Sequence, residues 1–255
     1  MKKKGKTFSV QLRIWRQGNG KAQGKMTQYK VNGIVPEMTF LDVLDKLNER
    51  LVSCGEIPVA FDSNCREGSC GMCGLIINGE IGRSTENSAV CRLTMKGFSN
   101  GDIITVEPWR IRSFPVVKDL AINRTALDRI LAAGGFITAS LGGAPEANSI
   151  PIPKDIADKA LSAASCNACG ACIAACPNGS AALFVAAKAA HLSLMPQGQP
   201  EKNARIISLV RAAQREGFGS CCNNGECEKA CPRGISKDLI ARMHREYLKA
   251  ILSDD

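Results

Sequence analysis

The chain has 255 residues and 13 cysteines, and its 33 Lys and Arg against 24 Asp and Glu give a formal net charge of +9. The length allows one or two hydrophobic cores, and no apolar stretch reaches the about eighteen residues that a membrane-spanning helix needs. Lys and Arg are spread through the chain without interleaved aromatic residues, so the charge is weak evidence for nucleic-acid binding.

The many cysteines are expected to be reduced. Disulfides need an oxidising compartment, but the sequence starts with Met1-Lys2-Lys3-Lys4 and shows neither an apolar signal segment nor a cleavage site. The lysine run is expected to be a solvated terminus.

The first half of the chain predicts a small mixed sheet that clasps one helix. Apolar residues alternate over residues 7–15, which predicts a strand. Residues 39–52 have apolar side chains at helical spacing behind a capping Thr39, which predicts a helix. Asn78-Gly79 after two isoleucines predicts a hairpin turn, and residues 103–106 predict another strand.

The first cysteine group lies within this half. Cys65, Cys70 and Cys73 follow the C-x4-C-x2-C spacing of plant-type 2Fe-2S sites, and Cys91 supplies a fourth thiolate. Glycines in this loop let the backbone approach inorganic sulfides and point N–H groups at them. These glycines, which we expect to line a cluster although they could mark only a turn, are Gly68, Gly71 and Gly74.

After Pro115 the strand pattern stops, and the second half is expected to be helical. Apolar residues recur at helical spacing in residues 155–165, 180–191, 201–216 and 236–252. The remaining cysteine runs are expected in loops joined to helices, where N–H groups can face an anionic cluster.

Two cysteine runs in this half predict two clusters. Residues 166–177 have the complete C-x2-C-x2-C-x3-C-P spacing, and residues 221–232 have it with Asn224 in place of one cysteine. Where two such runs occur together, the last cysteine of each ligates the cluster of the other. The predicted ligands are therefore Cys166, Cys169, Cys172 and Cys231 for a 4Fe-4S cluster, and Cys176, Cys221 and Cys227 for a 3Fe-4S cluster.

Other metal or cofactor chemistry is less well supported. Structural zinc prefers four ligands, and these seven cysteines do not divide into fours. No complete G-x-G-x-x-G is present at Gly18-Asn19-Gly20 or Leu141-Gly142-Gly143, which argues against flavin or nicotinamide binding. His191 and His244 are expected to be ordinary helix residues, and no nucleophile lies beside a base. The chain is therefore predicted to transfer electrons without catalytic residues of its own.

The order of these motifs resembles the iron-sulfur subunits of succinate dehydrogenase and fumarate reductase over almost the whole chain. The matching segments are residues 65–74, 104–108, 114–120, 166–177 and 221–232. With this resemblance, the predicted fold class is α+β. A β-grasp 2Fe-2S ferredoxin-like domain, residues 1–115, precedes an all-helical two-cluster ferredoxin domain, residues 116–255, which holds the 4Fe-4S and 3Fe-4S clusters.

The resemblance also implies function and partners. In that family an FAD-containing flavoprotein subunit carries the dicarboxylate site and exchanges electrons with the 2Fe-2S cluster. The 4Fe-4S and 3Fe-4S clusters connect it to a quinone beside a membrane-anchor subunit, often a b-type cytochrome. By resemblance, the first domain docks on the flavoprotein and the second on the anchor, and the chain lies peripherally on the cytoplasmic face of the cell membrane.

Departures from the family bear on the quinone. Ubiquinone-type members have a Trp five residues beyond the cysteine matching Cys176 and a His directly after the one matching Cys221. Here these positions are Ala181 and Cys222. Both changes remove groups that hold or reduce ubiquinone, so menaquinone is expected and the pocket residues stay open. The gap from Cys73 to Cys91 is longer than in many members, and its polar residues 83–88 are expected to form a loop.

Two cysteines and two tryptophans remain. Cys54 is expected to be a small buried side chain. Cys222 adjoins Cys221 and could replace it as a ligand, although the spacing to Cys227 favours Cys221. Trp15 and Trp109 are expected to serve packing or subunit contact.

Two other functions stay open. A free electron carrier is one, although such ferredoxins are usually small and acidic. The other is the electron-transfer subunit of a different flavoprotein, including a thiol-linked fumarate reductase.

Overall fold

The computed structural model describes residues 7–81, 89–137, 148 and 152–253. The N-terminal lysine run, the expected loop at residues 83–88 and Leu141-Gly142-Gly143 lie outside these residues. The chain divides into two compact units between Asn123 and Arg124. Each unit is described by itself.

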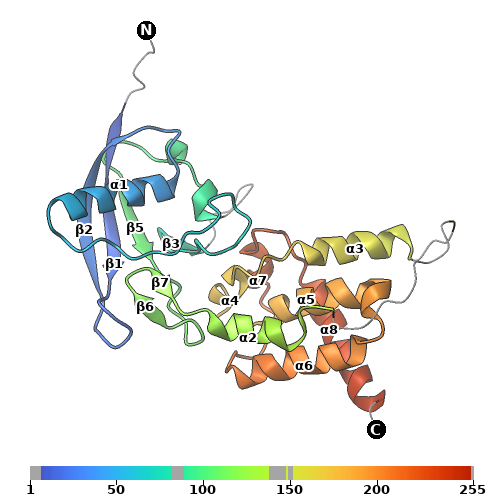
Figure 1. Ribbon diagram of the computed structural model, residues 1–255. Helices are drawn as coiled ribbons and strands as arrows, with labels where there is room; N and C mark the ends of the chain where they lie inside the picture. Colours follow the sequence, from blue (N-terminus) through green and yellow to red (C-terminus); the bar gives the residue numbers. More distant parts are fainter. Residues whose placement is uncertain (1–6, 82–88, 138–147, 149–151, 254–255) are drawn as a thin grey trace. The chain divides into compact units, whose positions relative to one another are not determined.

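The first unit is built on a five-stranded mixed sheet in the order β2-β1-β5-β3-β4 (Figure 1). β1 runs antiparallel to β2 and parallel to β5, whereas β3 runs antiparallel to both β5 and β4. A parallel pair needs a crossover connection, and the single long helix α1 lies on the chain between β1 and β5. The bounds are β1 (Phe8–Arg16), β2 (Lys25–Ile34), α1 (Phe40–Ser53), β3 (Ile76–Ile77), β4 (Glu80–Ile81) and β5 (Ile103–Glu107).

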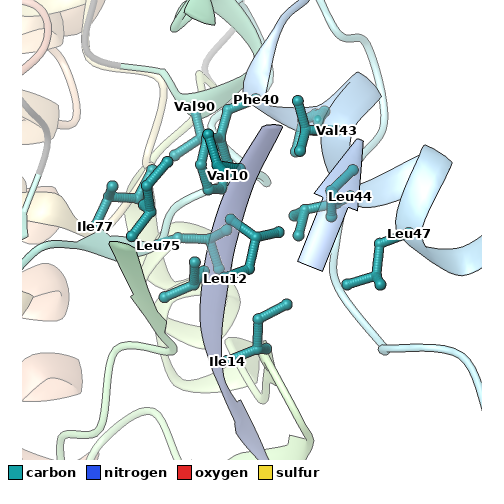
Figure 2. Packing of buried hydrophobic residues seen from close by; sticks show 14 of the residues in the cluster. Val10, Leu12, Ile14, Phe40, Val43, Leu44, Leu47, Leu75, Ile77 and Val90 are labelled. Atoms are coloured by element: carbon teal, nitrogen blue, oxygen red, sulfur yellow. The ribbon is translucent and has the colours of Figure 1, made fainter. Parts of the chain in front are cut away.

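Helix α1 begins where the sequence predicts. Thr39 and Asp42 form a capping box: the Thr39 hydroxyl accepts the N–H of Asp42 (3.2 Å), and the Asp42 carboxylate accepts the N–H of Thr39 (2.8 Å). The apolar side chains of α1 and those of β1, among them Val10, Leu12 and Ile14, belong to one buried core cluster (Figure 2). The buried side chains of α1 are Phe40, Leu41, Val43, Leu44, Leu47 and Leu51.

The predicted strands are confirmed, but one further strand was missed. β1 and β5 match the predicted segments, and the hairpin β3–β4 turns at Asn78 and Gly79, both with positive φ (+52° and +81°). β2 is an edge strand in which only Val31 and Ile34 are buried, so it lacks the alternating apolar pattern from which strands are predicted.

The prediction that strands end at Pro115 is wrong. β6 (Val116–Lys118) and β7 (Ala121–Ile122) form a short hairpin whose turn belongs to the first unit. The buried Asp119 fixes this turn, because its carboxylate accepts hydrogen bonds from the Arg16 guanidinium (3.0 Å) and from the N–H groups of Gln17 (2.9 Å) and Ala60 (3.0 Å). The boundary between the compact units therefore follows this hairpin.

The second unit is helical. α5 is apolar around most of its surface, and α3, α6 and α8 pack against it, while α2 packs on α6. The four predicted helices are confirmed as α3, α5, α6 and α8. None of the described helices is both long and apolar enough to cross a membrane. The helices are α2 (Thr125–Gly134), α3 (Lys154–Ala164), α4 (Ala171–Ala174), α5 (Ala182–Leu194), α6 (Lys202–Arg215), α7 (Glu226–Lys229) and α8 (Asp238–Ser253).

A buried arginine ties three segments of the second unit together. The Arg205 side chain of α6 is 3% exposed. Its guanidinium donates to the carbonyl oxygens of Gly134 (3.1 Å), Phe136 (3.1 Å) and Gly198 (3.0 Å), and it pairs with the Glu201 carboxylate (2.7 Å). It thereby satisfies the end of α2 and the turn that precedes α6.

Candidate metal centres

The first cysteine group lies in the loop between α1 and β3. Backbone N–H groups of this loop donate to cysteine sulfurs, from Glu67 and Cys70 to Cys65 (3.4 and 3.3 Å) and from Gly68 to Cys91 (3.2 Å). Cys91 lies in a 3-10 turn, Val90–Arg92. The structure thus brings Cys91 to the loop.

Glycine is required in this loop for two different structural reasons. Gly68 (φ +77°) and Gly71 (φ +70°) adopt the left-handed conformation that favours glycine. A Cβ on Gly74 would lie 2.2 Å from the indole ring of Trp109, so this position needs glycine for close packing. Trp109 is buried and also packs against Phe114, in agreement with the packing role expected for it.

Two thiols of this group have pKa values that are shifted in opposite directions. The N–H groups of Glu67 and Cys70 lower the pKa of Cys65 to about 6, whereas burial raises the pKa of Cys73 to about 12. Cys65 is therefore readily a thiolate, while Cys73 needs bound metal to displace its proton. Three thiols in a loop whose N–H groups point at sulfur, together with the thiol of Cys91, fit a 2Fe-2S cluster.

In the second unit, one cavity is lined by four cysteines from both runs. Cys166, Cys169 and Cys172 come from the first run, and Cys231 comes from the second. Burial raises the pKa of Cys169 to about 11 and that of Cys172 well above its usual value, so metal binding must release these protons. Lys188 of α5 donates to the carbonyl oxygen of Cys166 (2.7 Å) and brings a positive charge to this site.

A second cavity is also lined by four cysteines, Cys176 from the first run and Cys221, Cys222 and Cys227 from the second. Asn224 lines it where the complete spacing would have a cysteine, and its side-chain oxygen accepts the N–H of Glu226 (3.3 Å) at the start of α7. Lys237 also lines this cavity. Burial raises the pKa of Cys227.

Each of the two cavities combines cysteines of both runs, so that the last cysteine of each run lies with the other run. Cys231 lies with the first run and Cys176 with the second, and each run contains a one-turn helix, α4 or α7. Across the part of the chain that the structure describes, no three His, Cys, Asp or Glu side chains are placed to hold a single metal ion. In 3Fe-4S and 4Fe-4S clusters each thiolate binds a different iron, and the cysteines around each cavity fit a cluster of this kind.

Comparison with known proteins finds two families of iron-sulfur domain along the chain. Residues 11–129 match the family of the 2Fe-2S iron-sulfur cluster binding domain, and residues 161–235 match that of the 4Fe-4S dicluster domain. The succinate dehydrogenase iron-sulfur subunit of Bacillus subtilis is 30% identical over 225 residues, which cover 83% of this chain and 82% of that protein. The chain belongs to the family of succinate dehydrogenase and fumarate reductase iron-sulfur subunits.

Other members of the family are also similar to this chain. The fumarate reductase iron-sulfur subunit of Wolinella succinogenes is 30% identical over 58% of this chain and 57% of its own length. A fumarate reductase (CoM/CoB) subunit of Methanothermobacter marburgensis is 26% identical over 78% of this chain, but only 36% of that protein is covered. The fold matches a chain of the Mycobacterium smegmatis Sdh1 complex in the apo form with a TM-score of 0.63 at 18% identity, over 96% of this chain and 97% of that chain.

The predicted fold and the predicted role in electron transfer are therefore confirmed. The prediction for Cys54 is wrong. Cys54 was expected to be buried, and it is exposed. The apolar stripe of α1 would continue from Leu51 to Cys54, but the helix ends at Ser53 and Cys54 is its C-cap.

A larger cavity of about 230 Å³ lies beside Cys221. Ala181 lies in its wall at the position where ubiquinone-type members carry Trp, next to apolar side chains of α5 and α6. Its polar lining includes Gln214 of α6 and His244 of α8. His191 lies instead on α5, where burial lowers its pKa.

Proposed function

We propose that this chain relays electrons between the FAD of a flavoprotein subunit and a membrane quinone. The order of centres is 2Fe-2S, then 4Fe-4S, then 3Fe-4S. The observation that carries the proposal is the crossed sorting of two cysteine runs into two cavities, in a chain whose first unit holds a separate cysteine loop. The dicarboxylate site belongs to the flavoprotein partner.

The proposed ligand sets follow the cavities and the loop. Cys65, Cys70, Cys73 and Cys91 would hold the 2Fe-2S cluster. Cys166, Cys169, Cys172 and Cys231 would hold the 4Fe-4S cluster. Cys176, Cys221 and Cys227 would hold the 3Fe-4S cluster, for which the support is Asn224 at the fourth corner. When bound, the clusters supply one-electron redox chemistry, and the protein sets their potentials through burial and hydrogen bonds to sulfur.

The proposed partners follow from family membership. The first compact unit, up to Asn123 and with the 2Fe-2S loop, docks on the flavoprotein, and the helical unit from Arg124 docks on a membrane anchor of the cytochrome b type. The chain then lies peripherally on the cytoplasmic face of the membrane. Support for the second contact comes from the exposed Cys221, Cys222 and Asn224 around the second cavity, since a one-electron centre that serves a partner must lie near the surface.

Menaquinone is the proposed quinone. Ala181 and Cys222 stand in place of the Trp and His of ubiquinone-type members, and the 230 Å³ cavity beside Cys221 offers room for a quinone ring. Gln214 and His244 are among the polar side chains that line this cavity and can donate hydrogen bonds to the ring.

The test is purification of the native complex with its quinone, followed by metal analysis and electron paramagnetic resonance (EPR). We expect a flavoprotein, an anchor, inorganic sulfide, a three-iron signal in the oxidised complex, and separate 2Fe-2S and 4Fe-4S signals after reduction with dithionite. An isolated soluble chain that exchanges electrons with many partners would identify a free carrier instead. Zinc without sulfide would contradict the proposal entirely.

The three-iron assignment has its own test. Asn224→Cys is expected to convert the centre towards 4Fe-4S and to lower its potential, because the variant completes the spacing of the run. EPR of the oxidised complex should show loss of the three-iron signal. An unchanged three-iron signal would count against the assignment of this corner.

A thiol-linked fumarate reductase is the second candidate, favoured by the match to the Methanothermobacter protein. The two functions differ in the electron donor. A purified complex that reduces fumarate with a thiol pair, and does not react with a quinol, would support the second candidate.

A further inference from the structure

The second cavity of the helical unit contains a thiol that the proposed three-iron centre does not use. Cys222 lines this cavity together with Cys176, Cys221 and Cys227. The cavity proposed for the 4Fe-4S cluster is likewise lined by four cysteines. The two sites therefore offer equal numbers of thiols, although only one run keeps the complete cysteine spacing.

Asn224 occupies the corner where the spacing would place a cysteine. Its side-chain oxygen accepts the N–H of Glu226, the first residue of α7 (3.3 Å). A neutral amide is a poorer ligand for iron than a thiolate. Cys222 is thus the better fourth donor on the wall of this cavity.

The wall of this cavity also carries a positive charge. Lys237 lines the same cavity, and a cation there attracts an anionic cluster. The chain turns sharply after Cys222, since Asn223 has a φ of +55° and donates its N–H to the sulfur of Cys221 (3.4 Å). The side chain of Cys222 is not held in the core of this chain, because Cys222 is an exposed residue.

We infer that Cys222 is a fourth ligand through which this centre takes up and releases a fourth iron, so that it interconverts between 3Fe-4S and 4Fe-4S. This inference rests on the proposed three-iron assignment and extends it. Its consequence is that the cluster content of this site depends on the supply of ferrous iron and on the redox conditions.

The interconversion balances in atoms and charge. A reductant such as dithionite gives one electron to the oxidised core, which changes from singly positive to neutral. The Cys222 thiol releases its proton to solvent and its sulfur bonds to an incoming Fe²⁺, so the four-iron core is doubly positive. In release, an oxidant such as ferricyanide takes the electron, Fe²⁺ leaves, and Cys222 is protonated again.

The experiment uses the intact purified complex under anaerobic conditions. The complex is first oxidised with ferricyanide, then treated with dithionite and ferrous ammonium sulfate, separated from free iron and reoxidised mildly. EPR measures the three-iron signal and metal analysis measures iron per chain. We expect the wild-type signal to be lost, with a gain of one iron per chain.

Variants separate Cys222 from the alternatives. Cys222→Ser and Cys222→Ala should keep the three-iron signal and gain no iron, and neither removes a buried contact because Cys222 is exposed. Asn224→Ala tests the amide as the ligand and should take up iron as the wild type does. Cys54→Ser, which changes another exposed cysteine, is the matched control and should also behave as the wild type.

The outcomes are distinct. Iron uptake that persists in Cys222→Ala, or that is absent from a wild type with an intact three-iron signal, would overturn the inference and leave the proposed function standing. A wild type purified with four irons at this site, beside a Cys222→Ala variant with three, would support the inference. Absence of any cluster at this site in the oxidised wild type would instead overturn the proposed three-iron assignment.

Discussion

Cys91 lies eighteen residues beyond Cys73 in the sequence, yet the N–H of Gly68 donates to its sulfur. Cys91 is the only proposed 2Fe-2S ligand outside the loop of residues 65–73, and this contact brings its sulfur to that loop. Cys91→Ser is expected to disturb the 2Fe-2S centre alone, because the other ligand sets lie in the other compact unit. EPR should show a lost or altered 2Fe-2S signal with both other signals kept, and loss of either of those in folded protein would contradict the ligand set.

Lys188 is expected to raise the reduction potential of the 4Fe-4S centre. Burial raises the pKa of the Cys166 thiol, and the charge of Lys188 acts in the opposite direction. A positive charge favours the reduced, more negative cluster. Lys188→Gln keeps a donor for the Cys166 carbonyl but removes the charge, and should lower the potential by on the order of tens of millivolts.

Redox titration followed by EPR measures this shift. Lys159→Gln is the matched control, because Lys159 is an exposed residue of α3 that pairs with Asp155 (3.7 Å). It should leave the potential unchanged. Equal potentials for Lys188→Gln and the wild type would show that this charge does not act on the cluster.

Single residues were predictable where their spacing carries the information. Cysteines and cluster-loop glycines repeat at short, characteristic intervals, so sequence alone predicted the groups that the cavities later brought together. Lys188 was missed because the cysteine run ends at Pro177 and Lys188 lies eleven residues further along the chain. The residues around it form no motif that predicts a contact with the cluster site. Cys54 was misplaced because apolar periodicity does not reveal where a helix stops.

At the scale of elements, Arg205 links the end of α2 to the start of α6 through one guanidinium. Arg205→Ala would leave three buried or half-buried carbonyl oxygens without this donor and Glu201 without its cation. Loss of one partner from a buried ion pair costs about 3 kcal/mol or more. Urea unfolding at equal cluster content should show this loss in the free energy of unfolding.

The control is an arginine at the surface. Arg129 of α2 pairs with Glu216 (2.6 Å), but its side chain is 59% exposed. Such pairs add little to stability, so Arg129→Ala should unfold nearly as the wild type does. Similar destabilisation by both variants would mean that Arg205 contributes only as a surface charge would.

Elements with a complete apolar period were predictable, and shorter ones were not. α3, α5, α6 and α8 each span several turns and show the helical repeat, whereas α4 and α7 have four residues each. β2 carries few buried side chains because it lies at the edge of the sheet. α2 has no side-chain cap at Arg124 to signal its start.

For the whole molecule, cluster content should change the net charge. The polypeptide carries +9, and each thiolate-ligated cluster contributes about two negative charges, so the chain with three clusters carries about +3. In isoelectric focusing, the cluster-bearing chain should therefore focus at lower pH than the metal-free chain. The Cys91→Ser variant without its 2Fe-2S cluster should lie between them. Identical positions for all three would contradict three anionic clusters.

The boundary between the compact units was predictable only approximately. Pro115 ends the last strand pattern, but the hairpin β6–β7 is held to the first unit by Asp119, whose partners Arg16, Gln17 and Ala60 lie far away in sequence. Contacts of this kind arise from tertiary structure and leave no local pattern.

The crossed arrangement of the two cysteine runs has a consequence for biogenesis. With the proposed ligands, the 2Fe-2S set is complete once the ribosome has made Cys91, but the 4Fe-4S set waits for Cys231, which lies 140 residues further along the sequence. Neither centre of the helical unit can be filled before the second run has been synthesised. Iron-sulfur delivery to that unit must therefore come late, and a polypeptide truncated between the two runs would lose both centres together.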